Sequence, residues 1–218
     1  MSRIVPVAAA ILCAAGTLMC AATPAGAVSV ERTFAGQESR AGFTVEMQTT
    51  ITVPASVSAS AGAQVSAWVM DTSDINATSP SLFDQVGWIW ESSTGTPRLF
   101  AEYGTSLGAH VTAWHPWIGP RLVPGSTITV ALDCAPWLGL AATWYVAAGR
   151  WQPAGPPVDA AGLCVPGTWW GRMTEIDANP GTSVVYTPVT FSATSEIHDW
   201  YGRRLADVGP VAAISPGA

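Results

Sequence analysis

Hydrophobic and polar residues alternate along several short segments of this chain, which is the pattern of half-buried β-strands. Turn-forming residues separate the segments, and no segment beyond the N-terminal region sustains a helical period over three turns. The predicted strands cover residues 43–54, 64–71, 110–118, 126–133, 142–149, 168–177 and 183–193, together with a hairpin over 84–104. This spacing predicts an all-β fold, an antiparallel two-sheet β-sandwich or jelly roll. A helical turn is expected over residues 198–206.

The predicted hairpin joins two aromatic-rich strands through a polar loop of Ser, Thr, Gly and Pro. Side chains alternate between the two faces of a strand, so every second residue of each hairpin strand lies on the same face. The first strand presents Gln85, Gly87, Ile89 and Glu91 together, and the second presents Arg98, Phe100 and Glu102. We expect Glu91 to face Arg98, which would set Gly87 opposite Glu102 and Gln85 one step along. An amide and a carboxylate beside a glycine predict the floor of a polar cleft.

Residues 1–27 have the composition of a secretory signal peptide. A positive charge at Arg3 precedes an apolar run over 5–20, and the small residues 25–27 form a cleavage site before Val28. The apolar run is shorter than the roughly 20 residues that a membrane-spanning helix needs. We therefore expect a protein secreted by the Sec route, with no membrane partner after cleavage.

The expected mature chain is acidic and long enough for one sizeable core. It keeps 191 residues (218 − 27), with 8 basic residues (9 less Arg3) and 15 acidic ones, a net charge of −7. Such a charge disfavours nucleic acid and anionic membranes as partners. We expect one monomeric domain over 28–208 and a disordered tail over 209–218.

The mature chain contains two cysteines, Cys134 and Cys164. An even pair in an exported protein predicts one disulfide, and the alternative is two free buried thiols. The histidines lack the spacing and acidic neighbours of a metal site, so we expect no metal and no cofactor. The sequence G-T-S-L-G at 104–108 resembles a nucleophile elbow in its letters only, because no helix is expected to follow it.

Glu175 is the acid that the strand pattern singles out. Its strand face also carries Trp169, Gly171, Met173 and Asp177, an aromatic and apolar row. An acid in such surroundings suits general acid–base chemistry. The alternative is a rim carboxylate that faces water or pairs with Arg172 or Arg98.

Several short motifs occur in the order and approximate spacing of a known family. They are T-F-A-G at 33–36, I-T-V-P at 51–54, S-A-W-V at 66–69, Q-V-G at 85–87, F-A-E-Y at 100–103, G-S-T-I-T-V at 125–130, T-E-I-D at 174–177 and P-V-T-F at 188–191. On these motifs the chain resembles the glutamic peptidases, or eqolisins, and more loosely the neprosin-type glutamic peptidases. The likeness extends over about residues 33–193.

The resemblance implies a concanavalin A-like sandwich with Gln85 and Glu175 as the catalytic pair. Glu175 would activate a water and later protonate the leaving amine, and the Gln85 amide would bond the oxyanion. Trp68, Asp71 and Glu102 would support the pair or bind substrate. The implied partner is a protein or peptide substrate.

Three functions remain open from the sequence. The first is a secreted glutamic-type endopeptidase acting in acid. The second is a non-catalytic module that binds carbohydrate or peptide through exposed tryptophans on the same scaffold. The third is a jelly-roll glycoside hydrolase that would use Glu102 and Glu175 as its two carboxyl groups.

Overall fold

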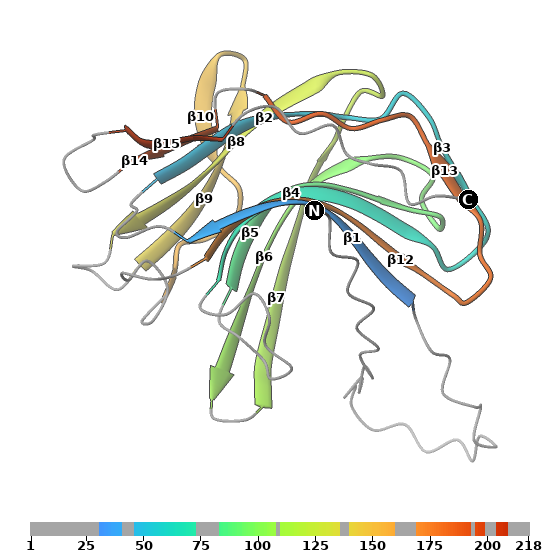
Figure 1. The fold of residues 1–218 in the computed structure, drawn as a ribbon, viewed down its shortest axis with the longest axis horizontal. Coiled ribbons are helices and arrows are strands. Elements are labelled where there is room, and N and C mark those ends of the chain that lie inside the picture. Colours follow the sequence, from blue (N-terminus) through green and yellow to red (C-terminus); the bar gives the residue numbers. More distant parts are fainter. Residues whose placement is uncertain are drawn as a thin grey trace.

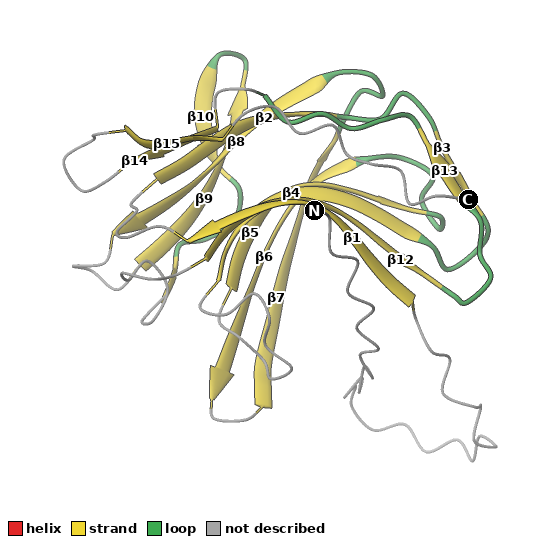
Figure 2. Cartoon of the chain, in the orientation of Figure 1, coloured by secondary structure: helices red, strands yellow, loops and turns green. Residues whose placement is uncertain are grey.

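The computed structural model describes residues 31–40, 46–72, 83–107, 110–135, 140–159, 169–192, 195–198 and 204–208. Within these ranges every regular element is a β-strand (Figure 2). The same ranges contain no helix that could cross a membrane. The predicted signal peptide, Cys164 and the predicted C-terminal tail lie outside them.

Two large antiparallel sheets face each other (Figure 1). In spatial order, sheet A consists of β1 (Glu31–Arg40), β12 (Trp169–Ala178), β4 (Gln64–Thr72), β5 (Phe83–Glu91), β6 (Arg98–Leu107) and β7 (His110–Arg121). Sheet B consists of β10 (Arg150–Pro153), β9 (Leu140–Ala147), β8 (Thr127–Ala135), β2 (Glu46–Thr52), β14 (Ser195–His198) and β15 (Arg204–Val208), with β11 (Val158–Asp159) paired to β9. The short strands β3 (Val57–Ala59) and β13 (Val184–Tyr186) pair with each other. The predicted all-β sandwich is confirmed.

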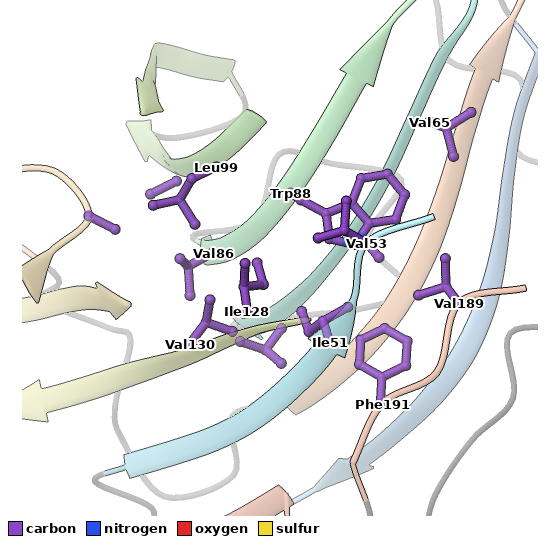
Figure 3. Packing of buried hydrophobic residues seen from close by; sticks show 14 of the residues in the cluster. Ile51, Val53, Val65, Val86, Trp88, Leu99, Ile128, Val130, Val189 and Phe191 are labelled. Carbon is purple, nitrogen blue, oxygen red and sulfur yellow. The ribbon is translucent and has the colours of Figure 1, made fainter. Parts of the chain in front are cut away.

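The core lies between the two sheets and is built from alternate residues of their strands (Figure 3). Sheet A contributes Val65, Val86, Trp88 and Leu99, and the opposing side contributes Ile51, Val53, Ile128, Val130, Val189 and Phe191. Burying one such side chain stabilises the fold by roughly 1.5–3 kcal/mol. The indole of Trp88 also donates a hydrogen bond of 3.0 Å to the carbonyl of Thr52, which ties sheet A to sheet B.

The hairpin pairs in a different register from the one expected. Gln85 lies directly opposite Glu102, and Ile89 lies opposite Arg98. The backbone N–H groups of Thr94 and Gly95 both bond to the Glu91 carbonyl, so Glu91 belongs to the turn and no longer pairs with β6. Because the shift is two residues, an even number, each side chain keeps its predicted face.

The helical turn expected over residues 198–206 is wrong at 198 and over 204–206, which are strand, and 199–203 lie outside the described residues. His198 ends β14 and Arg204 begins β15, and these two strands pair with each other. β14 also pairs with β2, so sheet hydrogen bonds to a distant strand override the local preference. In sheet A, β7 continues through Pro116, since an edge strand tolerates the missing N–H of proline.

Candidate active site

Gln85 and Glu175 lie on the same face of sheet A. Glu175 is in register with Ser66 of β4, which is in register with Ile89 of β5. Gln85 is four residues from Ile89 along β5, an even number, so both side chains project from one face. The opposite face carries the buried residues that pack against sheet B. We call the face that carries Gln85 and Glu175 the outer face.

Trp68 lies between these two residues on the outer face. It is in register with Met173 on β12 and with Gly87 on β5, one step along from Glu175 on one side and from Gln85 on the other. Its indole Nε1 donates a hydrogen bond of 2.9 Å to Oε2 of Glu175. Since Trp68 is only 2% exposed, this bond is shielded from water and fixes the orientation of the carboxyl group.

Glu102 holds the amide of Gln85. The Nε2 atom of Gln85 donates a hydrogen bond of 2.7 Å to Oε2 of Glu102, its direct cross-strand neighbour. A side-chain amide has two N–H groups. One of them therefore orients the amide on Glu102, and the second can donate to a ligand above the sheet.

The spacing of the strands sets the scale of the site. The Cα atoms of Gln85 and Glu175 are two strand spacings apart across the sheet, about 10 Å, and four residues apart along it, about 13 Å. The Glu175 carboxyl group is held on the side of Trp68, which lies between the two residues, and the Gln85 amide is held by Glu102. Gln85 is 7% and Glu175 is 8% exposed, so each keeps an edge that solvent can reach.

Gly87 is required by the close approach of β4 and β5 at Trp68. A Cβ atom on Gly87 would collide with the carbonyl oxygen of Ala67 and would lie 2.7 Å from Cα of Trp68. Both are backbone atoms, which cannot move without displacing the strand. The glycine thus permits the close approach of β5 to β4 at Trp68.

Asp71 is not part of this site, contrary to the role that the resemblance implied. It is an odd number of residues from Trp68, so it projects from the opposite face into the core, where it is 1% exposed. Its direct cross-strand neighbour is Asp84, which is 4% exposed. Burial raises the pKa of Asp84 well above 3.8, the charge of Asp71 raises it further, and the Gln85 backbone N–H lowers it. Sequence reasoning missed Asp84, although alternation places it in the apolar row of Val86 and Trp88.

Cys134 lies beside this acidic pair. Its sulfur is 3.9 Å from Oδ2 of Asp71. Cys134 is disulfide-bonded, so the sulfur has no proton to donate and the approach is a contact only. Cys164 lies outside the described residues, so the predicted pairing with it stays a prediction.

Neither arginine considered as a partner of Glu175 is placed next to it. Arg172 projects into the core, where it is fully buried and donates to the Ser192 carbonyl at 3.2 Å. Arg98 is on the outer face but three strands away. Glu175 is also not a rim carboxylate, since more than nine-tenths of its surface is buried. Among the described residues, no group of three or more His, Cys, Asp or Glu side chains could hold a metal ion.

The arrangement of strands is similar to that of solved glutamic peptidases. Scytalido-glutamic peptidase with a transition state analog inhibitor superposes with a TM-score of 0.61 at 16% identity, over 86% of this chain and 90% of that chain. The same peptidase with a peptide-based analog gives 0.58 at 16% identity, over 81% and 84%. SCP-B, an eqolisin in complex with the tripeptide Ala-Ile-His, gives 0.55 at 17% identity, over 81% and 83%. No protein-family model and no curated protein matches the sequence. The expected likeness is therefore confirmed for the fold: the chain folds as the glutamic peptidases do.

Proposed function

We propose that this chain is a secreted endopeptidase of the glutamic type that hydrolyses peptide bonds in an acidic medium. The observation that carries the proposal is the outer face of sheet A, where a Trp68-bound Glu175 and a Glu102-bound Gln85 lie on either side of Trp68. An oriented acid and an oriented amide are the two groups that water-mediated hydrolysis of a peptide bond needs. The glutamic peptidases that share the fold bind transition state analogs and a tripeptide.

The two groups have distinct roles in the reaction. The Glu175 carboxylate takes a proton from a water, whose oxygen attacks the carbonyl carbon of the scissile bond. The electron pair of the C=O bond moves to its oxygen, and the second N–H of Gln85 stabilises that oxyanion. The protonated Glu175 then gives its proton to the amide nitrogen as the C–N bond breaks. The products are a carboxylic acid and an amine, and Glu175 is a carboxylate again.

Trp68 and Glu102 position these groups without touching the reacting atoms. The indole N–H of Trp68 fixes the orientation of the Glu175 carboxyl group through Oε2. Glu102 sets the direction of the Gln85 amide. Hydrogen bonds to a charged group contribute roughly 1.5–3 kcal/mol each, enough to select one side-chain orientation.

Export and an acidic working medium are parts of the same proposal. Residues 1–27 supply the export signal, and a disulfide from Cys134 to Cys164 suits an oxidising compartment. The buried neighbours Asp71 and Asp84 are easiest to accommodate when a proton is present, which acid supplies.

Proteolysis of an unfolded protein between pH 3 and 5 tests the proposal. We expect wild type to cleave it, with activity falling by about 10²–10³ in Gln85→Ala and to background in Glu175→Gln. Glu91→Gln is the matched control, a half-buried acid at the far end of β5. Absence of cleavage by folded wild-type protein, or equal activity in wild type and both site variants, would overturn the proposal.

The glycoside hydrolase interpretation fits the site less well. Gln85 on β5 lies between Glu102 on β6 and Glu175 on β12 in the order of the strands. The Cα atoms of the two acids are therefore about 14 Å apart across the sheet and about 13 Å along it. A glycosidase needs its two carboxyl groups about 5–9.5 Å apart, whereas the Glu102 carboxyl is held by the Gln85 amide at 2.7 Å. The proteolysis assay also distinguishes the peptidase from a binding module without catalysis, because a binding module would not cleave the unfolded protein.

A further inference from the structure

Two arginines lie directly opposite each other on the outer face of sheet A. Arg98 on β6 is in register with Arg121 on β7, and the Leu122 N–H donates to the Pro97 carbonyl at 2.9 Å just beyond them. Like charges opposite each other destabilise a sheet. The chain has only 9 basic residues against 15 acidic ones, so a basic pair on one face is conspicuous.

A β-bulge orients the first of these arginines. The register of β6 and β7 shifts between Arg98 and Phe100, and the shift presents the carbonyl of Gly119 to the Arg98 guanidinium. Nε and Nη2 of Arg98 donate to this oxygen at 3.1 and 3.0 Å. The acceptor is a neutral carbonyl, so the bonds orient the guanidinium without compensating its charge. Arg98 is half-buried and Arg121 is exposed, which leaves the pair accessible from the outer face.

The arginine pair is at a defined distance from the proposed catalytic pair. Arg98 lies in the same cross-strand row as Glu175, three strand spacings away, so their Cα atoms are about 14 Å apart. The Cα atom of Arg98 is also about 14 Å from that of Gln85, since the two residues are one strand spacing apart across the sheet and four residues apart along it. An extended peptide advances roughly 3.3–3.6 Å per residue, so the pair is about four residues from the scissile bond.

We propose that Arg98 and Arg121 form a carboxylate-binding subsite, which selects peptides carrying a negative charge about four residues from the bond that is cut. The inference rests on the proposed peptidase function and names its substrate preference. Arginine matches the planar geometry of a carboxylate with paired N–H donors. The carboxylate can belong to an Asp or Glu side chain or to the C-terminus of a short peptide, and both present the same group.

Matched fluorogenic peptides test the subsite. One pair carries Glu or Gln four residues from the scissile bond on either side, and a second pair ends there as a free carboxylate or an amide. At pH 5 we expect about a tenfold higher kcat/KM for the charged member of at least one pair. For the Glu/Gln pair the preference should disappear near pH 3, where a glutamate of pKa about 4.3 is protonated.

Variants assign the preference to the two arginines. Arg98→Gln and Arg121→Gln should each reduce it to less than about threefold, and the double variant should abolish it. Arg121 is exposed, so its variant tests the idea even where Arg98→Gln disturbs the bulge. Arg150→Gln, on exposed β10 of sheet B, is the control and should keep the full preference.

Equilibrium binding of the same peptides to Glu175→Gln separates this inference from the proposed function. Cleavage and binding without any charge preference would overturn the subsite and leave the peptidase standing. A binding preference that needs Arg98 and Arg121, in a protein that cuts nothing, would support the subsite and overturn the peptidase. A preference that survives in the double variant would also overturn the subsite.

Discussion

Asp71 and Asp84 lie directly opposite each other on β4 and β5, with both carboxyl groups inside the sandwich. The other cross-strand neighbour of Asp84 is Tyr103 on β6. Burial, and then the charge of Asp71, raise the pKa of Asp84 well above that of an ordinary aspartate. The folded protein therefore binds a proton here that the unfolded chain releases above about pH 4.

This pair predicts that stability falls as the pH rises. Below about pH 4 Asp84 is protonated in both states, and its contribution is fully present. Between that pH and the raised pKa, the folded state binds more protons, so the free energy of unfolding falls by up to about 1.4 kcal/mol per pH unit. Asp84→Asn cannot ionise and should exceed the wild type in stability at pH 7, while matching it closely at pH 3. Urea unfolding followed by tryptophan fluorescence measures both.

Asp71→Asn provides a second check on the same pair. Removing the neighbouring charge should lower the pKa of Asp84, so the loss of stability with rising pH should be smaller than in wild type and end at a lower pH. Part of the loss should remain, because burial is the larger cause of the raised pKa. Parallel pH profiles for wild type and Asp84→Asn would show that the pair does not hold a proton.

Loss of the Trp68 indole should impair catalysis more than folding. Trp68→Phe keeps the aromatic packing but removes the N–H that bonds Glu175, so kcat should fall roughly 10–100-fold with little change in KM. Trp88→Phe is the control, since its indole bonds Thr52 inside the core. That variant should lose about 1–3 kcal/mol of stability and keep its kcat per folded molecule. Equal kcat losses in the two variants would refute the positioning role of Trp68.

Glu102 should act through the direction in which it holds Gln85. Glu102→Ala removes the acceptor of the amide N–H, and kcat should fall roughly tenfold or more. Glu102→Gln keeps an acceptor oxygen and should recover most of the lost activity. Steady-state kinetics on one peptide distinguish these outcomes, and a failure of the glutamine variant to recover activity would count against this role.

Gly87→Ala should destabilise the fold strongly. The added Cβ meets backbone atoms of Ala67 and Trp68, so we expect a loss of about 3 kcal/mol in the free energy of unfolding. Gly149→Ala is the comparison, because Gly149 has φ of 72° but no atom within 4 Å of an added Cβ. It should lose only about 1–2 kcal/mol, the cost of a left-handed alanine. Similar losses at the two positions would contradict the close approach at Gly87.

The alternation of side chains predicted much of this site, because the face on which a side chain lies depends only on its position within the strand. Alternation predicted the face of Gln85 within β5 and the face of Glu175 within β12, each strand by itself. It could not show that the two faces coincide, since β12 enters sheet A beside β4 from a distant part of the chain. Only backbone pairing over that separation brings the acid and the amide together.

The errors arose where local chemistry or short motifs replaced strand geometry. Asp71 was assigned to the site by its place in a motif, although its odd spacing from Trp68 puts it on the other face. The hairpin register depended on which residues close the turn, and two N–H groups converging on the Glu91 carbonyl decided it. A pairing of Glu175 with Arg172 was one of the alternatives, because the strand pattern gave no sign that this arginine would be fully buried in the core.

The hydrogen bond between Trp68 and Glu175 joins residues 107 positions apart. On the ribosome, β4, β5 and β6 emerge first and can pair as neighbours, yet the place beside β4 stays vacant until β12 is made. Contacts between such distant segments form late and slowly. A nascent chain that has already exposed Gln85 and Trp68 thus lacks Glu175, and under the proposed function it would be unable to hydrolyse its own unfolded segments while synthesis is still in progress.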